Sequence, residues 1–131
     1  MTEKKMQYGE FCWYELMTNE PEKAQEFYGS LLGWHFMEHD FGGTKYTSIK
    51  AGEKEMGGIM QIPQDKKDRI PTHWLNYIHV ENLDTTLTKA KSLGATVCVE
   101  ATPVSDFGRF AVIIDPTGAS IALWQTLKNC D

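Results

Sequence analysis

Outside two helical segments, the apolar residues of the chain fall in short runs separated by polar and turn residues, which is typical of strands. Four such runs occupy the first half of the chain, and four more occupy the second half. They are FCWYELM, WHFME, KYTSI and EMGGIMQI, followed by HWLNYIHV, TVCVE, RFAVII and SIALWQ. The pattern therefore predicts a protein built largely of short strands.

Two segments show a helical period instead. The first follows Asn19, where Thr18 or Asn19 can cap a helix that Gly33 ends. Its apolar positions recur at helical spacing: Ala24, Phe27, Tyr28, Leu31 and Leu32. The second begins near Asn82 and ends at Gly94, with its own apolar stripe: Leu83, Leu87, Ala90 and Leu93. Each segment is predicted to form an amphipathic helix.

The order of these elements repeats, because each half reads strand, helix, strand, strand, strand. We expect one α+β domain over residues 1–131 with two βαβββ modules, at about residues 9–62 and 72–125. The joint PQDKKDRIP, residues 63–71, is polar and bracketed by prolines, as a linker should be. Two such sheets can curl into a half-barrel with the helices outside. Its cleft would be lined by the inward strand faces and would suit a small molecule.

The last strand poses a question of chemistry. Asp115-Pro116 followed by Gly118 predicts a turn before it. Ile121 and Leu123 then share one face, which looks like core. The opposite face carries no group that could do chemistry: Ser120, Ala122 and Trp124.

Charge and cysteine content narrow the function classes. The 131 residues carry a formal net charge of −5, so nothing favours a nucleic-acid partner. The sequence has no apolar run near the ~20 residues that span a bilayer, so no membrane partner is expected. Cys12, Cys98 and Cys130 are odd in number and lack C-x-x-C spacing, which predicts a reducing, cytoplasmic location. Cys12 and Cys98 are interpreted as small buried hydrophobes.

Three motifs carry a resemblance to a known family. They are WYELMTNEPEKAQEFYGSLLGW, LNYIHVENLDTTLTKAKSLGA and GRFAVIIDPTGASIALWQ, which together run from about Gly9 to Gln125. With the duplicated βαβββ plan, they resemble the vicinal oxygen chelate superfamily of glyoxalases, bleomycin-resistance proteins and extradiol dioxygenases. The closest likeness is to a single-domain, glyoxalase-like branch. The resemblance also implies a homodimer, since small proteins of this shape often pair edge to edge.

Metal-dependent members of that superfamily hold one divalent ion with four His, Glu or Gln side chains. The resemblance places those four positions here on Trp13, Gln61, Leu75 and Ala122. Only Gln61 could ligate an ion, so we expect no metal and no other cofactor. A shifted site formed by Glu15, Gln61 and His79, with His73 at its mouth, would need moves of about 6.6 Å along a strand. Zinc ligands must sit within about 2.0–2.2 Å, so such a shift would have to arise independently.

The inward faces give a set of candidate cleft residues: Trp13, Glu15, Gln61, Leu75, Tyr77, His79, Arg109, Ala122 and Trp124. Trp13 and Trp124 either stack on a planar ligand or fill a barrel that lacks its metal. Glu15 either pairs with Arg109 or His79 or acts as a general base. Arg109 either meets an anionic ligand group or ties its loop to the opposite half.

Three functions remain open at this point. The first is a metal-free protein that binds a small planar or partly apolar ligand in the cleft. The second is a glyoxalase-like lyase or isomerase, or a dioxygenase, that is metal-assisted or uses Glu15 and His79 for acid–base chemistry. The third is an interaction module with a collapsed cleft. The Gly57-Gly58 pair suits a close backbone approach and not a phosphate cradle, since no helix follows it.

Overall fold

The fold was analysed in a computed structural model, which describes residues 7–41, 44–66 and 68–127. The chain divides into two compact units. One is Trp13–Leu75; the other is Asn76–Asp131 with Met1–Cys12, of which residues 76–127 and 7–12 are described. Cys130 lies outside the described residues.

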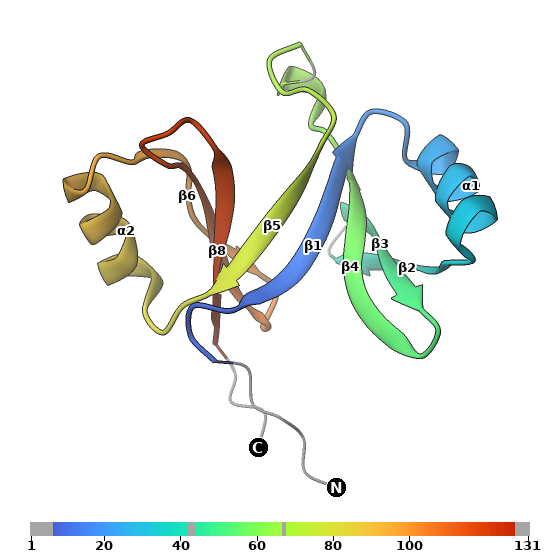
Figure 1. Ribbon diagram of the computed structural model, residues 1–131, viewed down its shortest axis with the longest axis horizontal. Coiled ribbons are helices and arrows are strands. Elements are labelled where there is room, and N and C mark those ends of the chain that lie inside the picture. Colours follow the sequence, from blue (N-terminus) through green and yellow to red (C-terminus); the bar gives the residue numbers. More distant parts are fainter. Residues whose placement is uncertain (1–6, 42–43, 67, 128–131) are drawn as a thin grey trace, which may run out of the picture. The chain divides into compact units, whose positions relative to one another are not determined.

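The first unit pairs one helix with four strands (Figure 1). In chain order these are β1 (Phe11–Thr18), α1 (Pro21–Leu32), β2 (His35–Phe41), β3 (Thr44–Ala51) and β4 (Lys54–Gln61). Within the sheet the strand order is β2-β3-β4-β1. Strand β1 runs parallel to β4, whereas the other two pairings are antiparallel.

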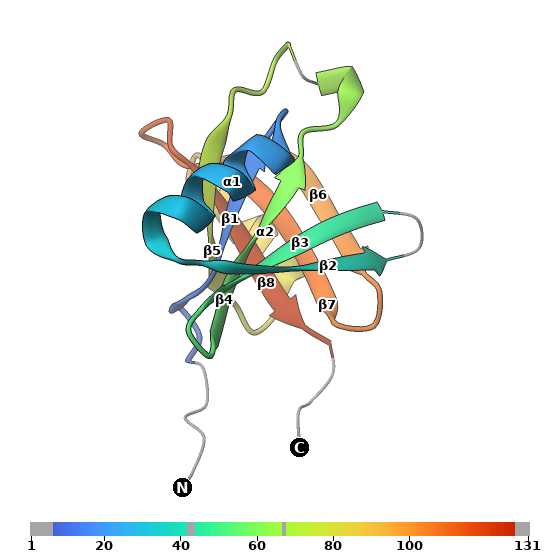
Figure 2. The same cartoon turned by 90° about the vertical axis from the view of Figure 1, so that its right-hand side faces the viewer.

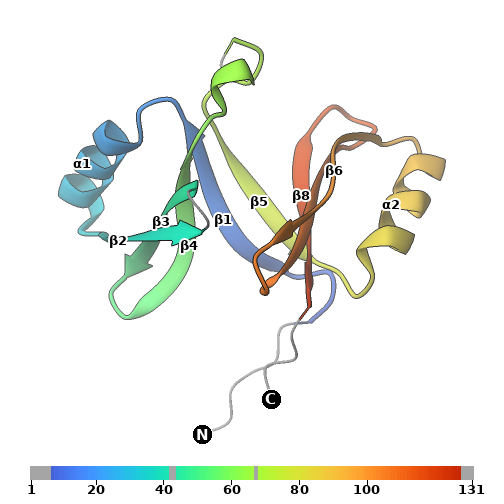
Figure 3. The ribbon, with the colours of Figure 1, turned by 180° about the vertical axis from the view of Figure 1, so that it is seen from behind.

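The second unit repeats this plan, as Figure 3 shows from behind. It uses β5 (His73–His79), α2 (Leu83–Ser92), β6 (Thr96–Val104), β7 (Gly108–Ile114) and β8 (Ser120–Thr126). The strand order is β5-β8-β7-β6, with β5 parallel to β8. A short 3-10 helix, Gln64–Lys66, lies in the segment predicted to be the linker. The α+β class and the two βαβββ modules are confirmed. The half-barrel and its cleft stay predictions.

Each unit has its own hydrophobic core between the helix and one face of the sheet. In the first unit Leu16, Ile49 and Ile59 are buried, and Ala24 and Tyr28 of α1 pack against them. In the second unit the buried core is formed by Leu83, Leu87, Ala111, Ile113 and Leu123. The predicted core face of the last strand, with Ile121 and Leu123, therefore packs toward α2.

Helix α1 (Figure 2) departs from its predicted apolar stripe. Ala24 and Tyr28 pack on the sheet, but Phe27, Leu31 and Leu32 are each more than half exposed. The predicted cap is also wrong, because Glu20 is the N-cap residue and its side chain makes no capping hydrogen bond. The hydroxyl of Thr18, one of the expected caps, instead accepts a hydrogen bond from the backbone N–H of Glu20.

Helix α2 follows its prediction more closely. The Asn82 side chain accepts a hydrogen bond from the N–H of Thr85, as expected of an N-cap. Leu83 and Leu87 are buried, whereas Leu93 is 66% exposed beyond the last turn. No helix among the described residues is both long and apolar enough to cross a membrane.

The turn before β8 forms around Asp115. Its carboxylate accepts hydrogen bonds from the Thr117 hydroxyl at 2.7 Å, and from the backbone N–H groups of Thr117 and Ala119 at 2.8 and 3.0 Å. These bonds lower the pKa of the Asp115 carboxyl, the Thr117 hydroxyl contributing most. Gly118 has a φ of 100°, which explains the glycine at this position. The predicted turn is confirmed.

The two described cysteines differ in their burial. Cys12 is half-buried, and burial raises the pKa of its thiol to about 11, so it is unreactive at neutral pH. Cys98 is exposed on β6, so its interpretation as a buried hydrophobe is wrong. The reason is its place on an edge strand, where one face meets solvent.

Two consecutive glycines allow close contacts on either side of strand β4. A Cβ atom added at Gly57 would collide with the backbone oxygen of Tyr14 on the paired strand β1. A Cβ atom added at Gly58 would collide with the hydroxyl end of the Tyr46 ring. The Gly57-Gly58 pair therefore serves a close approach, as the sequence predicted.

We expect Gly58→Ala to destabilise the protein by about 1–3 kcal/mol, because the new methyl group must displace the Tyr46 ring. Urea unfolding of the wild type and the variant measures this cost. In a Tyr46→Ala background the same substitution should cost clearly less, since no ring remains to be displaced. Equal costs in both backgrounds would show that the ring is not the reason for the glycine.

Candidate functional site

Each sheet has a helix-covered face and a face turned away from its helix. Side chains alternate along the strands, so residues neighbouring the core positions lie on the second kind of face. We call these the first and second open faces. The first carries Trp13, Glu15, Met37, His39, Tyr46, Ser48 and Gly58. The second carries Tyr77, His79, Phe110, Val112, Ala122, Trp124 and Thr126.

A hydrogen-bonded relay crosses the first open face. The indole N–H of Trp13 donates to the Tyr46 hydroxyl oxygen at 2.6 Å. That hydroxyl also hydrogen-bonds the carboxylate of Glu15. Because its oxygen accepts from Trp13, its proton is directed at Glu15. Three side chains from β1 and β3 are thus held in one orientation.

The Tyr46 phenol is kept neutral by its surroundings. Burial raises its pKa most, and the nearby negative charge of Glu15 raises it further. The bond from Trp13 acts in the opposite sense but is outweighed. Glu15 itself is only 5% exposed. The relay therefore ends on a carboxylate that is almost completely removed from solvent.

A second polar pair lies on the same face. His39 Nε2 and Ser48 Oγ are hydrogen-bonded at 3.0 Å, and Ser48 Oγ also donates to the Met37 carbonyl oxygen at 3.4 Å. In the strand registers, Ser48 stands opposite Gly58, which stands opposite Glu15. Sequence reasoning missed Tyr46, His39 and Ser48. The signal that could have found Tyr46 was Gly58, since a glycine inside a strand often marks a close approach.

The second open face is mainly aromatic. Ala122 is fully buried on β8, opposite Tyr77 of β5 and Val112 of β7. The rings of Tyr77 and Phe110 meet with their centroids 6.2 Å apart, although β8 runs between their strands. The small side chain of Ala122 leaves room for them. A packing role therefore explains the small side chain at this position.

Trp124 lies over a glycine, much as Tyr46 does. A Cβ atom at Gly108 would approach the Trp124 ring to 2.6 Å, and the Trp124 N–H donates to the Thr126 hydroxyl at 3.1 Å. His79 Nε2 is 3.5 Å from the same hydroxyl, and the His79 ring packs on Tyr8. Its other ring nitrogen, Nδ1, is buried without a hydrogen-bond partner in the described structure. His79 is thus held mainly by packing.

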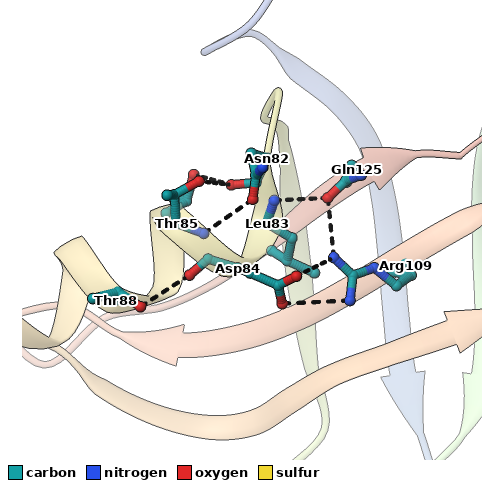
Figure 4. Close-up of polar contacts among 8 residues, drawn as sticks. Asn82, Leu83, Asp84, Thr85, Thr88, Arg109 and Gln125 are labelled. Atoms are coloured by element: carbon teal, nitrogen blue, oxygen red, sulfur yellow. Dashed lines mark hydrogen bonds and ion pairs between the residues drawn. The ribbon is translucent and has the colours of Figure 1, made fainter.

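Arg109 lies on the helix-covered face of its sheet (Figure 4). Its guanidinium forms an ion pair with Asp84 of α2 at 3.1 Å and donates to the Gln125 side-chain oxygen at 3.2 Å. The same oxygen accepts the backbone N–H of Leu83 at 2.7 Å. Arg109 therefore ties β7 and β8 to the start of α2 within its own unit. From the sequence we had expected Arg109 to contact either an anionic ligand or the opposite half of the chain, whereas its observed partners are Asp84 and Gln125.

Gln61 also lies on a helix-covered face, because it stands opposite Thr18 and shares the side of Ile59. Its amide donates only at 3.4 and 3.5 Å, to the carbonyl oxygens of Asn19 and Ile62. It borders a small cavity of about 130 Å³ beside Pro21 at the start of α1. The structure thus brings Trp13 and Glu15 together on one face of the first unit and places Gln61 on the other face. Leu75 is buried two residues before Tyr77 on β5.

The side chains at the four positions where the resemblance places metal ligands do not fit a metal ion. Indole, isobutyl and methyl groups, at Trp13, Leu75 and Ala122, carry no ligand atom for one. The fourth, Gln61, faces α1. Among the described residues, no three His, Cys, Asp or Glu side chains are grouped so that they could hold an ion.

We expect Gln125→Leu to destabilise the protein by about 1–2 kcal/mol, because Leu83 N–H and Arg109 lose their shared acceptor. Urea unfolding checks this value. Gln61→Leu is a matched control, since it makes the same change at the end of β4, where the amide has only long contacts. If Gln61→Leu lowers the free energy of unfolding as much as Gln125→Leu does, the hydrogen bonds of Gln125 at the start of α2 do not explain the loss of stability.

We expect Tyr46 to stay protonated where ordinary tyrosines ionise, near pH 10. Ultraviolet titration follows the phenolate absorbance of the protein's five tyrosines. The wild type and Tyr46→Phe should give the same absorbance change through that range, because Tyr46 contributes nothing to it. A smaller change in the variant would mean that Tyr46 ionises normally and that the relay is open to water.

Comparison with known proteins gives the same assignment at the level of family. Residues 11–123 match the model of the Glyoxalase/Bleomycin resistance protein/Dioxygenase superfamily. A protein of Mycobacterium bovis named "Putative glyoxylase CFP32" is 38% identical over 112 residues, which are 85% of this chain and 42% of that protein. The anthracycline biosynthesis protein DnrV of Streptomyces peucetius is 26% identical over 126 residues, with 87% and 46% covered. The chain thus spans less than half the length of these curated relatives.

Solved structures share the fold at low sequence identity. A hypothetical protein from Bacillus halodurans, BH1468, superposes with a TM-score of 0.69 at 12% identity, covering 95% of this chain and 99% of the other. The strand order, the two modules and the match over most of the sequence lead to one conclusion. The chain belongs to the glyoxalase/bleomycin resistance protein/dioxygenase superfamily.

Proposed function

We propose that this protein binds a small planar or partly apolar organic molecule without the help of a metal ion, on the first open face. The observation that carries the proposal is the relay from Trp13 through Tyr46 to Glu15. It fixes an indole ring beside a buried carboxylate. Fixed aromatic rings with a small number of placed polar groups are typical of small-molecule sites.

The surroundings of the relay support a planar ligand. Trp13 is half-buried, so the residue is not closed off from solvent. Met37 of β2 on the same face is 53% exposed, and Met60 of β4, two residues after Gly58 on that face, is half-buried. Methionine side chains adapt their shape and make favourable contacts with aromatic rings. A flat molecule could therefore stack on Trp13 with the methionines around its edge.

The family and its members are compatible with binding alone. The superfamily's description includes bleomycin resistance proteins besides glyoxalases and dioxygenases. One relative is named for anthracycline biosynthesis. The side chains at Trp13, Leu75 and Ala122 give no support to the metal-assisted reactions of other members. Binding is the function that the first open face supports best.

We expect the wild type to bind acridine, a neutral three-ring probe, and Trp13→Leu to weaken this binding by about tenfold. Acridine fluorescence in an equilibrium titration gives both dissociation constants. Trp74→Leu is the matched control, because Trp74 is 40% exposed and hydrogen-bonds Tyr28 of α1 instead. It should leave the affinity unchanged.

Native mass spectrometry and metal analysis of the purified protein complete the test. The proposal expects no stoichiometric nickel, zinc, manganese or iron, and an acridine affinity that EDTA leaves unchanged. A bound metal that EDTA removes together with the affinity would contradict the metal-free part. No binding of acridine, or equal losses in the two tryptophan variants, would contradict the assignment of the site.

A further inference from the structure

The cavity of about 130 Å³ at the start of α1 lies between that helix and the sheet of the first unit. On the sheet side, Glu38, Thr47 and Ile59 stand opposite one another across β2, β3 and β4. They share the helix-covered face, because Ile59 belongs to the core. Lys45 and Gln61 lie on the same face, two residues from Thr47 and Ile59 along their strands.

The helix side of the cavity is polar as well. Glu22 and Gln25 line it, and residues three apart lie on one side of a helix. Apart from Pro21 and Ile59, every side chain around the cavity carries a hydrogen-bonding group. The cavity is therefore suited to a polar occupant, in contrast to the aromatic second open face.

Thr47 is the buried polar side chain of this cavity. It is 7% exposed, and its hydroxyl forms no hydrogen bond with any residue that the structure describes. Other buried hydroxyls of the unit have partners: Thr18 accepts from the Glu20 N–H, and Ser48 donates to the Met37 carbonyl oxygen. A buried polar group without a partner is unfavourable. A molecule bound in the cavity would supply one for Thr47.

The charges around the cavity favour a cation. Glu22 and Glu38 provide two carboxylates and Lys45 provides one ammonium group. Within the described part of the chain, none of these three forms an ion pair. Asp40 of β2 stands directly opposite Lys45, so a further carboxylate lies beside that ammonium group. The carboxylates therefore outnumber the positive side chains.

Two neighbouring positive charges do not reverse this balance. The start of α1 carries partial positive charge, which opposes a cation, but Glu22 in the first turn offsets it. Lys23 forms an ion pair with Glu20 at 3.9 Å, so these two charges offset each other. Negative charge prevails around the cavity.

A flat cation with several N–H donors matches this lining. Carboxylate, amide and hydroxyl oxygens all accept hydrogen bonds, and Glu22, Glu38, Gln25, Gln61 and Thr47 offer them here. The volume is about four times the ≈ 30 Å³ that one water molecule takes up in the liquid. A guanidinium group, which has four heavy atoms, is of suitable size.

We infer that the cavity at the start of α1 binds a small organic cation of the guanidinium kind, with Glu22 and Glu38 as the groups that select its charge. This site goes beyond the proposed function, because it lies on the helix-covered face and the relay lies on the first open face. Neither proposal depends on the other.

Guanidinium and urea provide a matched pair of probes, because both are flat, have nearly the same shape and differ in charge. In a ¹⁵N NMR titration at pH 7 and about 0.15 M ionic strength, guanidinium chloride up to about 50 mM should shift the backbone amide signals of Thr47 and Gln61 until they saturate. The side-chain amide signals of Gln25 and Gln61 should move with them. Urea should bind at least about tenfold more weakly.

Two variants test the lining. Glu38→Gln should weaken guanidinium binding by about fivefold or more, because it removes a selecting charge. Glu53→Gln removes the same charge in the exposed turn between β3 and β4 and should leave the affinity unchanged. Thr47→Val replaces the hydroxyl by a methyl group and should weaken binding by about threefold or more. Circular dichroism confirms that all three variants are folded.

A longer probe distinguishes two sources of the guanidinium group. N-acetyl-arginine amide carries the same group on a longer stem. Weaker binding than guanidinium supports a small free cation as the occupant, and tighter binding supports an arginine side chain of a peptide.

The remaining outcomes would overturn the inference. It is wrong if guanidinium gives no saturable shift, if sodium chloride or urea gives the same shifts, or if Glu53→Gln weakens binding as much as Glu38→Gln. It is also wrong if calcium chloride moves the same signals at lower concentration, since the site would then hold a metal ion. The binding of acridine is tested separately and is unaffected by these results.

Discussion

The first unit depends on the absence of one methyl group. Tyr46 of β3 must extend across β4 to reach Trp13 and Glu15 of β1, and it passes over Gly58. Any Cβ at that position would occupy the space of the ring. Glycine weakens a strand by roughly 0.5–1 kcal/mol relative to alanine. The glycine carries this cost in stability, and in return it leaves the space that the Tyr46 ring needs to reach Trp13 and Glu15.

The second unit uses the same device with a different chemical result. Gly108 of β7 leaves space for the Trp124 ring, and Ala122 of β8 leaves space where the Tyr77 and Phe110 rings meet. The outcome is an aromatic surface with few polar groups, whereas the first open face ends on a buried carboxylate. The two modules therefore share their architecture but differ in the chemistry of their open faces. The fixed indole beside a buried carboxylate is the reason for proposing the first open face as the ligand site.

The helix-covered faces hold polar groups that serve the fold. Arg109 and Gln125 anchor the first turn of α2, where unpaired backbone N–H groups need acceptors. In the Arg109–Asp84 pair the Asp84 side chain is 72% exposed, and pairs open to solvent on this scale contribute about 0–1 kcal/mol. The shared oxygen of Gln125 is the more important part of this anchor. These residues connect the sheet to the helix within the second unit.

The sequence by itself determined the elements and their order. Short apolar runs identified eight strands, and Asn82, Gly33 and Gly118 marked helix ends and a turn, because these are local properties of adjacent residues. It also placed Trp13 and Glu15 on one strand face. Only the tertiary structure decided which residues from other strands join them. Strand register put Tyr46 and Ser48 beside Glu15 and turned Gln61 and Arg109 toward the helices, since a shift of one residue reverses the face of a side chain.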